Sequence, residues 1–454
     1  MTPARTLLGA ALGLAIAVTA GAATPPAEIA SPRSNLRYDF DYPDLNYGTA
    51  RASNAIEKLQ QRMDAGEVRL KNEPPRGYLD SLLKALQIDP SSQVLIYSKT
   101  SLQTDFIDPA TPRAVYFNDH TYVASVHGSP FIEISTVDPA LGVMFYHLVS
   151  DPQKPARFGR ETGRCLSCHD TYSMLGGGTP RVVVTSAPVI QSDGTPPMET
   201  SGTTTDRSPI AERWGGWYVT GHTGNQKHLG NLPLDDPRRP PPGPLSSAPR
   251  NIMSVAKLFD TSTYLRDTSD VVALMVLEHQ TNVQNLMTRA MFKSRTALRR
   301  VSGDAPEPQR WQDLPAALQK SFVPLAEPLA QALLMEDVVG LAEPMRSSSG
   351  YDRWFQQQGP RDAEGRSLRD LDLGDRVFRY PLSYLLYSEA FDALPPFFKD
   401  YVYTRIERSV HERDLSAQEL AARRTAAAIL AATKPDFAAH AQRAGQVPSA
   451  ADGG

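Results

Sequence analysis

Val94-Leu95-Ile96-Tyr97 is the first of five short apolar runs that decide the fold of this chain. The others are Ala114-Val115-Tyr116-Phe117, Tyr122-Val123-Ala124-Ser125-Val126, Phe131-Ile132-Glu133-Ile134 and Val143-Met144-Phe145-Tyr146. Branched and aromatic residues of this kind favour β-strands. Turn-forming residues separate the later runs at Asn118-Asp119, Gly128-Ser129-Pro130 and Asp138-Pro139. The stretch therefore predicts an antiparallel β-meander, and two further strands are expected at 181–184 and 217–219.

The pattern becomes helical after a proline-rich connection at 237–249. Apolar residues then recur at three- and four-residue spacing, which is typical of amphipathic helices. Helices are predicted at 269–300, 314–320, 325–339, 351–357, 382–391, 397–408 and 417–432, and two shorter ones before the meander at 54–65 and 78–86. Asp267, Thr268 or Ser269 is expected to cap the longest helix, and Pro315 and Pro328 to lie in first turns. The predicted fold class is α+β, with an antiparallel β-meander and the region around 165–170 followed by a mainly helical C-terminal half.

Both cysteines of the chain lie in one motif, C-x-x-C-H, at Cys165-Leu166-Ser167-Cys168-His169. This motif is the attachment signature of a c-type haem. On one helical turn, positions i, i+3 and i+4 share a face. Cys165 and Cys168 can thus reach the two vinyl groups of one porphyrin, while His169 presents an imidazole to the iron. We expect one haem c, covalently bound through Cys165 and Cys168, with His169 as the proximal ligand.

Pairs of cysteines at this spacing also have uses other than haem attachment. A redox-active dithiol normally follows a strand in a βαβ pattern, and no such pattern precedes Cys165. A closed structural zinc site needs four ligands, and the chain has no second cysteine pair. A buried disulfide or a chance match is the remaining alternative. The dithiol is the main rival of the haem.

The first residues are typical of an exported protein. A single arginine at Arg5 precedes the apolar run Leu7–Val18, and Ala20-Gly21-Ala22 offers a small-residue cleavage site. A signal peptide at 1–23 predicts a periplasmic protein without a membrane span in the mature chain; the alternative is an uncleaved signal that anchors the chain to the outer face of the inner membrane. A net charge of −3 suggests no nucleic-acid partner.

The expected organisation has four parts after the signal. They are an N-terminal extension with short helices at 24–92, a β-rich haem c-binding region at 93–250, a helical region at 251–440 and a disordered tail at 441–454.

The second axial position of the iron is left open by the sequence. A polar, glycine-rich loop supplies His222 and His228 as possible distal groups, and His279 is a weaker candidate on the long helix. Further residues that could approach the haem are His120, His127 and His147 on the meander and Met198 and Met253. Met174 follows His169 by only five residues and is not expected to reach the opposite face. Arg164 and Arg181 are the candidates to bind the haem propionates, because a guanidinium can donate two parallel hydrogen bonds to a carboxylate.

In the C-x-x-C-H motif and the export signal, the chain resembles the c-type cytochromes. Segments such as Arg213-Trp214-Gly215-Gly216-Trp217-Tyr218 and Phe378-Arg379-Tyr380-Pro381-Leu382 are also similar to large, uncharacterised bacterial proteins that contain a cytochrome c domain. The resemblance implies haem binding and electron transfer. It does not imply a compact class I cytochrome, because many β-like residues precede the motif.

Two functional classes follow from one haem in an exported chain. The first is a monohaem c-type cytochrome that takes part in periplasmic electron transfer and docks with a redox partner protein. The alternative is a haem enzyme, peroxidase- or oxygenase-like, with an open distal face, or a haem-based binding or sensing module.

Overall fold

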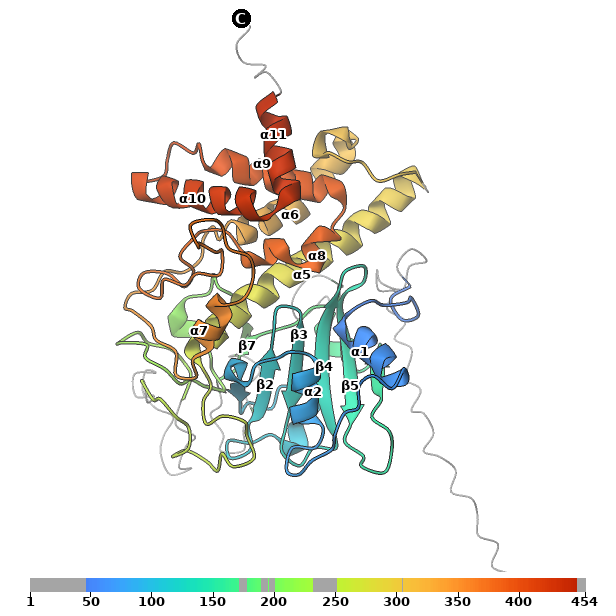
Figure 1. The fold of residues 1–454 in the computed structure, drawn as a ribbon, viewed down its shortest axis with the longest axis vertical. Coiled ribbons are helices and arrows are strands. Elements are labelled where there is room, and N and C mark those ends of the chain that lie inside the picture. The colour runs from blue at the N-terminus through green and yellow to red at the C-terminus, as the bar shows by residue number, and fades with distance from the viewer. Residues whose placement is uncertain are drawn as a thin grey trace, which may run out of the picture. The chain divides into compact units, whose positions relative to one another are not determined.

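A seven-stranded antiparallel sheet organises the N-terminal half of the protein (Figure 1). The computed structural model describes residues 46–170, 178–188, 195, 201–231, 251–303 and 305–446. The strands are β1 (Val94–Ile96), β2 (Arg113–Phe117), β3 (Thr121–Ser125), β4 (Phe131–Asp138), β5 (Gly142–Val149), β6 (Phe158–Glu161) and β9 (Trp217–Tyr218), in the order β6-β5-β4-β3-β2-β1-β9. A separate pair joins β7 (Thr185–Ser186) to β8 (Gly202–Thr203). The predicted meander is confirmed, and the predicted strand at 217–219 is β9.

Strand β6 is an addition that the sequence pattern did not predict. Its residues, Phe158-Gly159-Arg160-Glu161, include no branched residue, and glycine is normally depleted in strands. Pairing with β5 stabilises it instead, with Phe145 opposite Glu161 and His147 opposite Gly159. The sheet therefore ends in an edge strand only four residues before Cys165.

One face of the sheet is covered by the helices that precede it in the chain. Helix α1 (Ala55–Asp64) packs against β4, and α2 (Leu79–Ala85) joins the same apolar core. Asn54 caps α1 by accepting hydrogen bonds from the next turn, and its amide reaches the Tyr146 hydroxyl at 3.0 Å. Successive side chains of a strand point to opposite faces of the sheet, so Met144 and Tyr146, two residues apart on β5, both point to the face that α1 covers.

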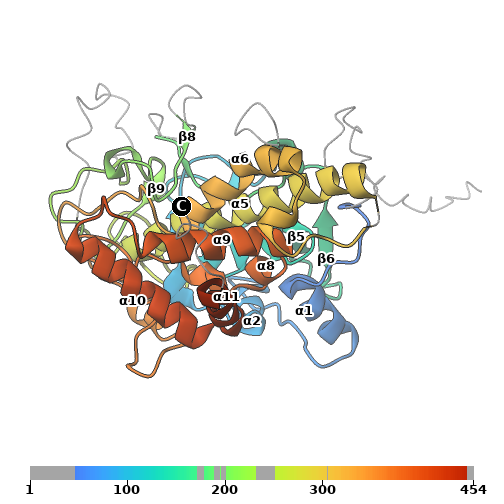
Figure 2. The same cartoon turned by 90° about the horizontal axis from the view of Figure 1, so that it is seen from above.

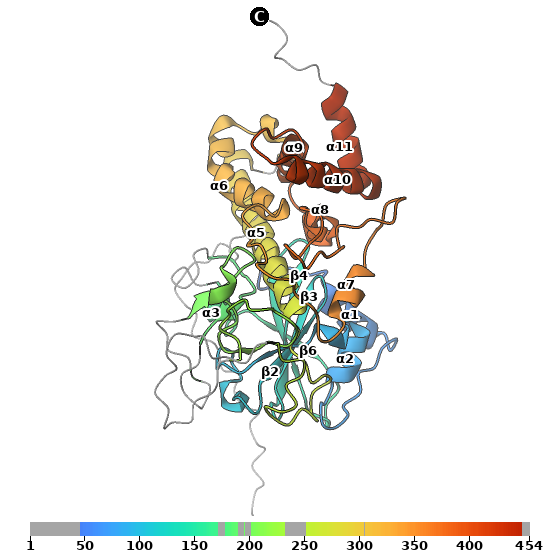
Figure 3. The same cartoon turned by 90° about the vertical axis from the view of Figure 1, so that its left-hand side faces the viewer.

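The opposite face meets the long helix α5 (Val271–Ser302), as Figure 3 shows from the side, with α3 away from α1 and α2. Tyr122 belongs to this face and donates a hydrogen bond of 2.6 Å to Gln284. Asp270, rather than the three preceding residues, caps the helix through Val272 and Ala273. Its other carboxylate oxygen accepts hydrogen bonds from the segment Ser347–Ser349, and Asp270 is fully buried. One carboxylate therefore fixes both the start of α5 and a distant loop.

The C-terminal half is helical, as predicted. Its helices are α6 (Ala316–Leu333), α7 (Tyr351–Gln356), α8 (Glu389–Asp392), α9 (Pro396–Ser409), α10 (Ala417–Thr433) and α11 (Pro435–Gln446). The last three pack on one another (Figure 2). Two predicted helices at 314–320 and 325–339 are one continuous helix, α6, with Pro324 and Pro328 inside it. Packing against α5 and α9 outweighs the hydrogen bonds that the two prolines cannot donate.

Several sequence predictions concern the ends of the chain. The segment 1–23, predicted to be a signal peptide, lies outside the described residues, as do positions 447–454. Helix α11 extends to Gln446, into the range 441–454 that was expected to be disordered. Among the residues that the structure describes, no helix has the length and apolar character needed to cross a bilayer.

Candidate functional site

The C-x-x-C-H motif forms one turn of helix, α3 (Leu166–His169), as its spacing predicts. The Cys165 carbonyl accepts hydrogen bonds from the backbone N–H of Cys168 at 3.3 Å and of His169 at 3.0 Å. Leu166 is buried in the core and anchors the turn, whereas Cys168 is exposed. A helical turn places residues i, i+3 and i+4 on one face. Cys165, Cys168 and His169 are therefore presented together.

The imidazole of His169 is held by the backbone of the segment that follows the motif. Its Nδ1 lies 2.8 Å from the Arg181 carbonyl, and the Arg181 N–H donates back to the His169 carbonyl at 3.2 Å. The ring also packs against Phe145 of β5, with 4.7 Å between centroids. Because a carbonyl only accepts, Nδ1 carries the proton and Nε2 has the lone pair. Burial lowers the pKa of His169, which favours the neutral imidazole that binds metals.

Asn285 of α5 fixes the segment that holds His169. Its Oδ1 accepts from the Val182 N–H at 2.9 Å, and its Nδ2 donates to the Val182 carbonyl at 2.6 Å. These bonds use both backbone groups of Val182, so the strand predicted at 181–184 does not form; the nearest strand among the described residues, β7, starts at Thr185. Nothing in the apolar sequence of 182–184 indicates that the Asn285 side chain takes the place of a neighbouring strand.

The two cysteines are free thiols and do not form a disulfide with each other. Burial, reinforced by the carboxylates of Glu161 and Glu133, raises the pKa of Cys165 to about 12. A redox-active dithiol needs a nucleophilic cysteine whose pKa is lowered, and Cys165 has the opposite environment. This observation weighs against the dithiol interpretation.

The two arginines predicted to bind haem propionates have different surroundings. Arg164 is exposed and pairs with Glu161 at 2.8 Å. Arg181 is buried beside the motif; burial lowers the pKa of its guanidinium, and the nearby Asp170 carboxylate raises it. Glu161 also lies 2.8 Å from Nδ1 of His147, and the interactions with His147 and then Arg164 lower the pKa of its carboxyl.

The loop histidines lie at the other edge of the sheet from the motif. His228 follows β9, is buried against Trp214, and accepts a hydrogen bond from the Gly230 N–H at 3.1 Å. His222 pairs through its backbone with Arg346. Five strand spacings of an open sheet, about 24 Å, separate β9 from β5. The structure therefore does not bring His222 or His228 to His169, because β9 pairs with β1 rather than with β6.

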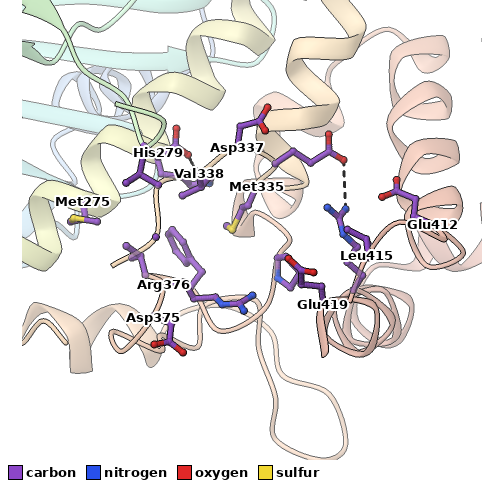
Figure 4. A pocket seen from close by; sticks show the side chains of 18 of the residues that line it. Met275, His279, Met335, Asp337, Val338, Asp375, Arg376, Glu412, Leu415 and Glu419 are labelled. Carbon is purple, nitrogen blue, oxygen red and sulfur yellow. Dashed lines mark hydrogen bonds and ion pairs between the residues drawn. The ribbon is translucent and has the colours of Figure 1, made fainter. Parts of the chain in front are cut away.

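His279 belongs to a buried hydrogen-bonded chain at the wall of a cavity of about 710 Å³ (Figure 4). Its Nδ1 lies 2.6 Å from Asp206 and its Nε2 lies 2.8 Å from the Ser383 hydroxyl, so both ring nitrogens have partners. Ser383 is fully buried and also caps the Leu385 N–H. We therefore regard the Asp-His-Ser chain as a link between α5 and two loops, and His279 has no nitrogen free for iron.

Arg213, which lines this cavity, forms a buried pair with Glu278. Arg213 lies 2.8 Å from Glu278, and neither side chain is exposed. Burial raises the pKa of Glu278 to about 7, although the charge of Arg213 lowers it. No sequence motif predicted this pair, because its two residues are 65 positions apart in the chain.

One of the methionine candidates lies among the described residues. Met174 and Met198 lie outside the described residues, and Met253 is exposed. Within the described part of the chain, no group of three or more His, Cys, Asp or Glu side chains could hold a metal ion.

Comparison with known proteins gave no match: no family model, no curated protein and no solved structure is significantly similar to this chain.

Proposed function

We propose that the protein is an exported c-type cytochrome that carries one haem on Cys165, Cys168 and His169 and takes part in periplasmic electron transfer. One observation carries the proposal. The motif lies on a single helical turn, and the Arg181 carbonyl holds Nδ1 of His169 at 2.8 Å. Haem-ligating histidines need this kind of outer partner, because it fixes the ring and leaves Nε2 for the metal.

The surrounding residues fit a covalent haem. Two unpaired thiols stand on the same turn as a neutral imidazole, and the buried Leu166 holds that turn on the core. The porphyrin itself supplies four of the iron ligands, so a haem needs no cluster of protein ligands. When bound, the haem would change by one electron between its ferric and ferrous states. The task of the chain is then to orient His169 and to hold the haem beside a docking partner.

Acid–acetone extraction of the protein, expressed in a host that attaches c-type haem, tests the proposal. The colour should stay with the wild-type chain and with Ser167→Ala, which changes an exposed residue between the two cysteines. It should be lost from Cys165→Ala/Cys168→Ala. Extraction of the colour from the wild-type protein, or its retention by the double variant, would contradict covalent attachment.

A visible spectrum separates the two functional classes. An electron carrier should be low-spin in the ferric state and should not bind carbon monoxide after reduction. High-spin iron that binds carbon monoxide would favour the haem enzyme or the sensing module. Identification of the N-terminal residue of the protein purified from the periplasm tests cleavage of the signal.

A further inference from the structure

A second histidine lies beside the motif on the same face of the sheet. His147 is two residues from Phe145 on β5, and alternate residues of a strand point to one face. The Phe145 ring contacts His169. His147 also stands directly opposite Glu133 of β4, whose charge acts on both Cys165 and His169. His147 is thus a neighbour of the motif across the sheet, although 22 positions separate it from His169 in the printed sequence.

The imidazole of His147 is oriented as a metal ligand would be. Its Nδ1 lies 2.8 Å from the carboxylate of Glu161, which is only 11% exposed, so this side of the ring faces a buried acid. A carboxylate that holds one ring nitrogen of a histidine directs the other nitrogen to a metal. His169 is held in the same way, by a carbonyl at Nδ1. In both imidazoles Nδ1 has a protein oxygen beside it, and Nε2 is the nitrogen left for a metal.

A glycine makes room for this ring. His147 pairs with Gly159 of β6, and a Cβ at Gly159 would lie 2.3 Å from the imidazole. Any other residue would push the ring aside. The side chain is 30% exposed, so it is accessible from outside the core.

The remaining histidines have other surroundings. His222 and His228 lie near the β9 edge, His279 has partners at both nitrogens, His120 and His127 lie in exposed turns, His440 lies between Asp400 and Glu407, and His411 follows α9. We propose that His147 is the second axial ligand of the haem iron, opposite His169. This inference rests on the proposed function, and it makes the site a closed, bis-histidine centre suited to electron transfer rather than to binding a small oxidant.

The test is the spin state of the ferric haem in the full-length holoprotein. The wild-type protein should be low-spin, and His147→Ala should become high-spin and bind carbon monoxide after reduction. Added imidazole should restore the low-spin spectrum of His147→Ala. The matched control is His127→Ala, an exposed histidine of the same meander, which should stay low-spin.

A second variant acts on the ring without removing it. Gly159→Ala leaves both His147 and Glu161 in place, and it should also weaken the low-spin spectrum by displacing the imidazole. Covalent haem that is high-spin in the wild type, or low-spin in both His147→Ala and Gly159→Ala, would overturn the assignment of His147 while leaving the cytochrome intact. Absence of covalent haem from the wild-type protein would overturn the proposed function together with this inference.

Discussion

The support of His169 by α5 can be tested with a single substitution, Asn285→Ala. The side chain of Asn285 makes two hydrogen bonds to Val182, at 2.9 and 2.6 Å, and Val182 follows the residue that holds His169. Each such bond contributes about 1 kcal/mol net. Alanine recovers about 0.5 kcal/mol, because it is the better helix former in the middle of α5. We therefore expect the free energy of unfolding to fall by about 1.5 kcal/mol.

Urea unfolding followed by tryptophan fluorescence measures this change. Arg289→Ala is the control, since it alters an exposed residue one turn further along α5 and should change the stability by no more than about 0.5 kcal/mol. Asn285→Asp should be worse than Asn285→Ala, because it sets a carboxylate oxygen against the Val182 carbonyl. The reasoning is refuted if Asn285→Ala unfolds at the same urea concentration as the wild type, or if Asn285→Asp is as stable as Asn285→Ala.

Three further predictions concern the core around α5. Asp270→Asn turns an amide N–H toward the groups that donate hydrogen bonds to Asp270, so the free energy of unfolding in urea should fall by at least about 3 kcal/mol. The control, Asp267→Asn, changes an exposed carboxylate and should leave the stability nearly unchanged. Between about pH 4.5 and 7 the folded state keeps a proton on Glu278 that the unfolded chain has lost, so the free energy of unfolding should fall as the pH rises. Glu278→Gln should flatten this fall in urea midpoints measured from pH 5 to 8. An unchanged slope would contradict the role of Glu278. His279→Ala should cost about 2–3 kcal/mol through its two lost hydrogen bonds, yet leave the spectrum of the proposed haem unchanged; a spectral change would contradict the placement of His279 away from the iron.

The local elements could be predicted because they depend on nearby residues. The five apolar runs carry their own turn signals, and each becomes a strand. Where a local pattern failed, a distant partner had decided the outcome. Val182–Val184 has strand-forming residues but is held by a side chain 103 positions away, and the prolines of α6 are tolerated because the helix packs against α5 and α9.

The candidate site, too, has one part that depends on nearby residues and another that depends on distant partners. The sequence supplied Cys165, Cys168 and His169 as a set, since one helical turn brings them together whatever surrounds it. It could not rank the other histidines, because their distance from the motif depends on the order of the strands. His222 and His228 are attached to β9, and the pairing of β9 with β1 puts them at the far edge.

By itself, then, the sequence determined a β-meander, a helical C-terminal half and one turn that presents two thiols and an imidazole, because spacing along the chain fixes each of these. Only the tertiary structure decided which carbonyl holds His169, which helix holds that carbonyl, and which histidine lies across the sheet from the motif. Those contacts join residues far apart in the chain, through hydrogen bonds and strand pairing that form only when the core is packed.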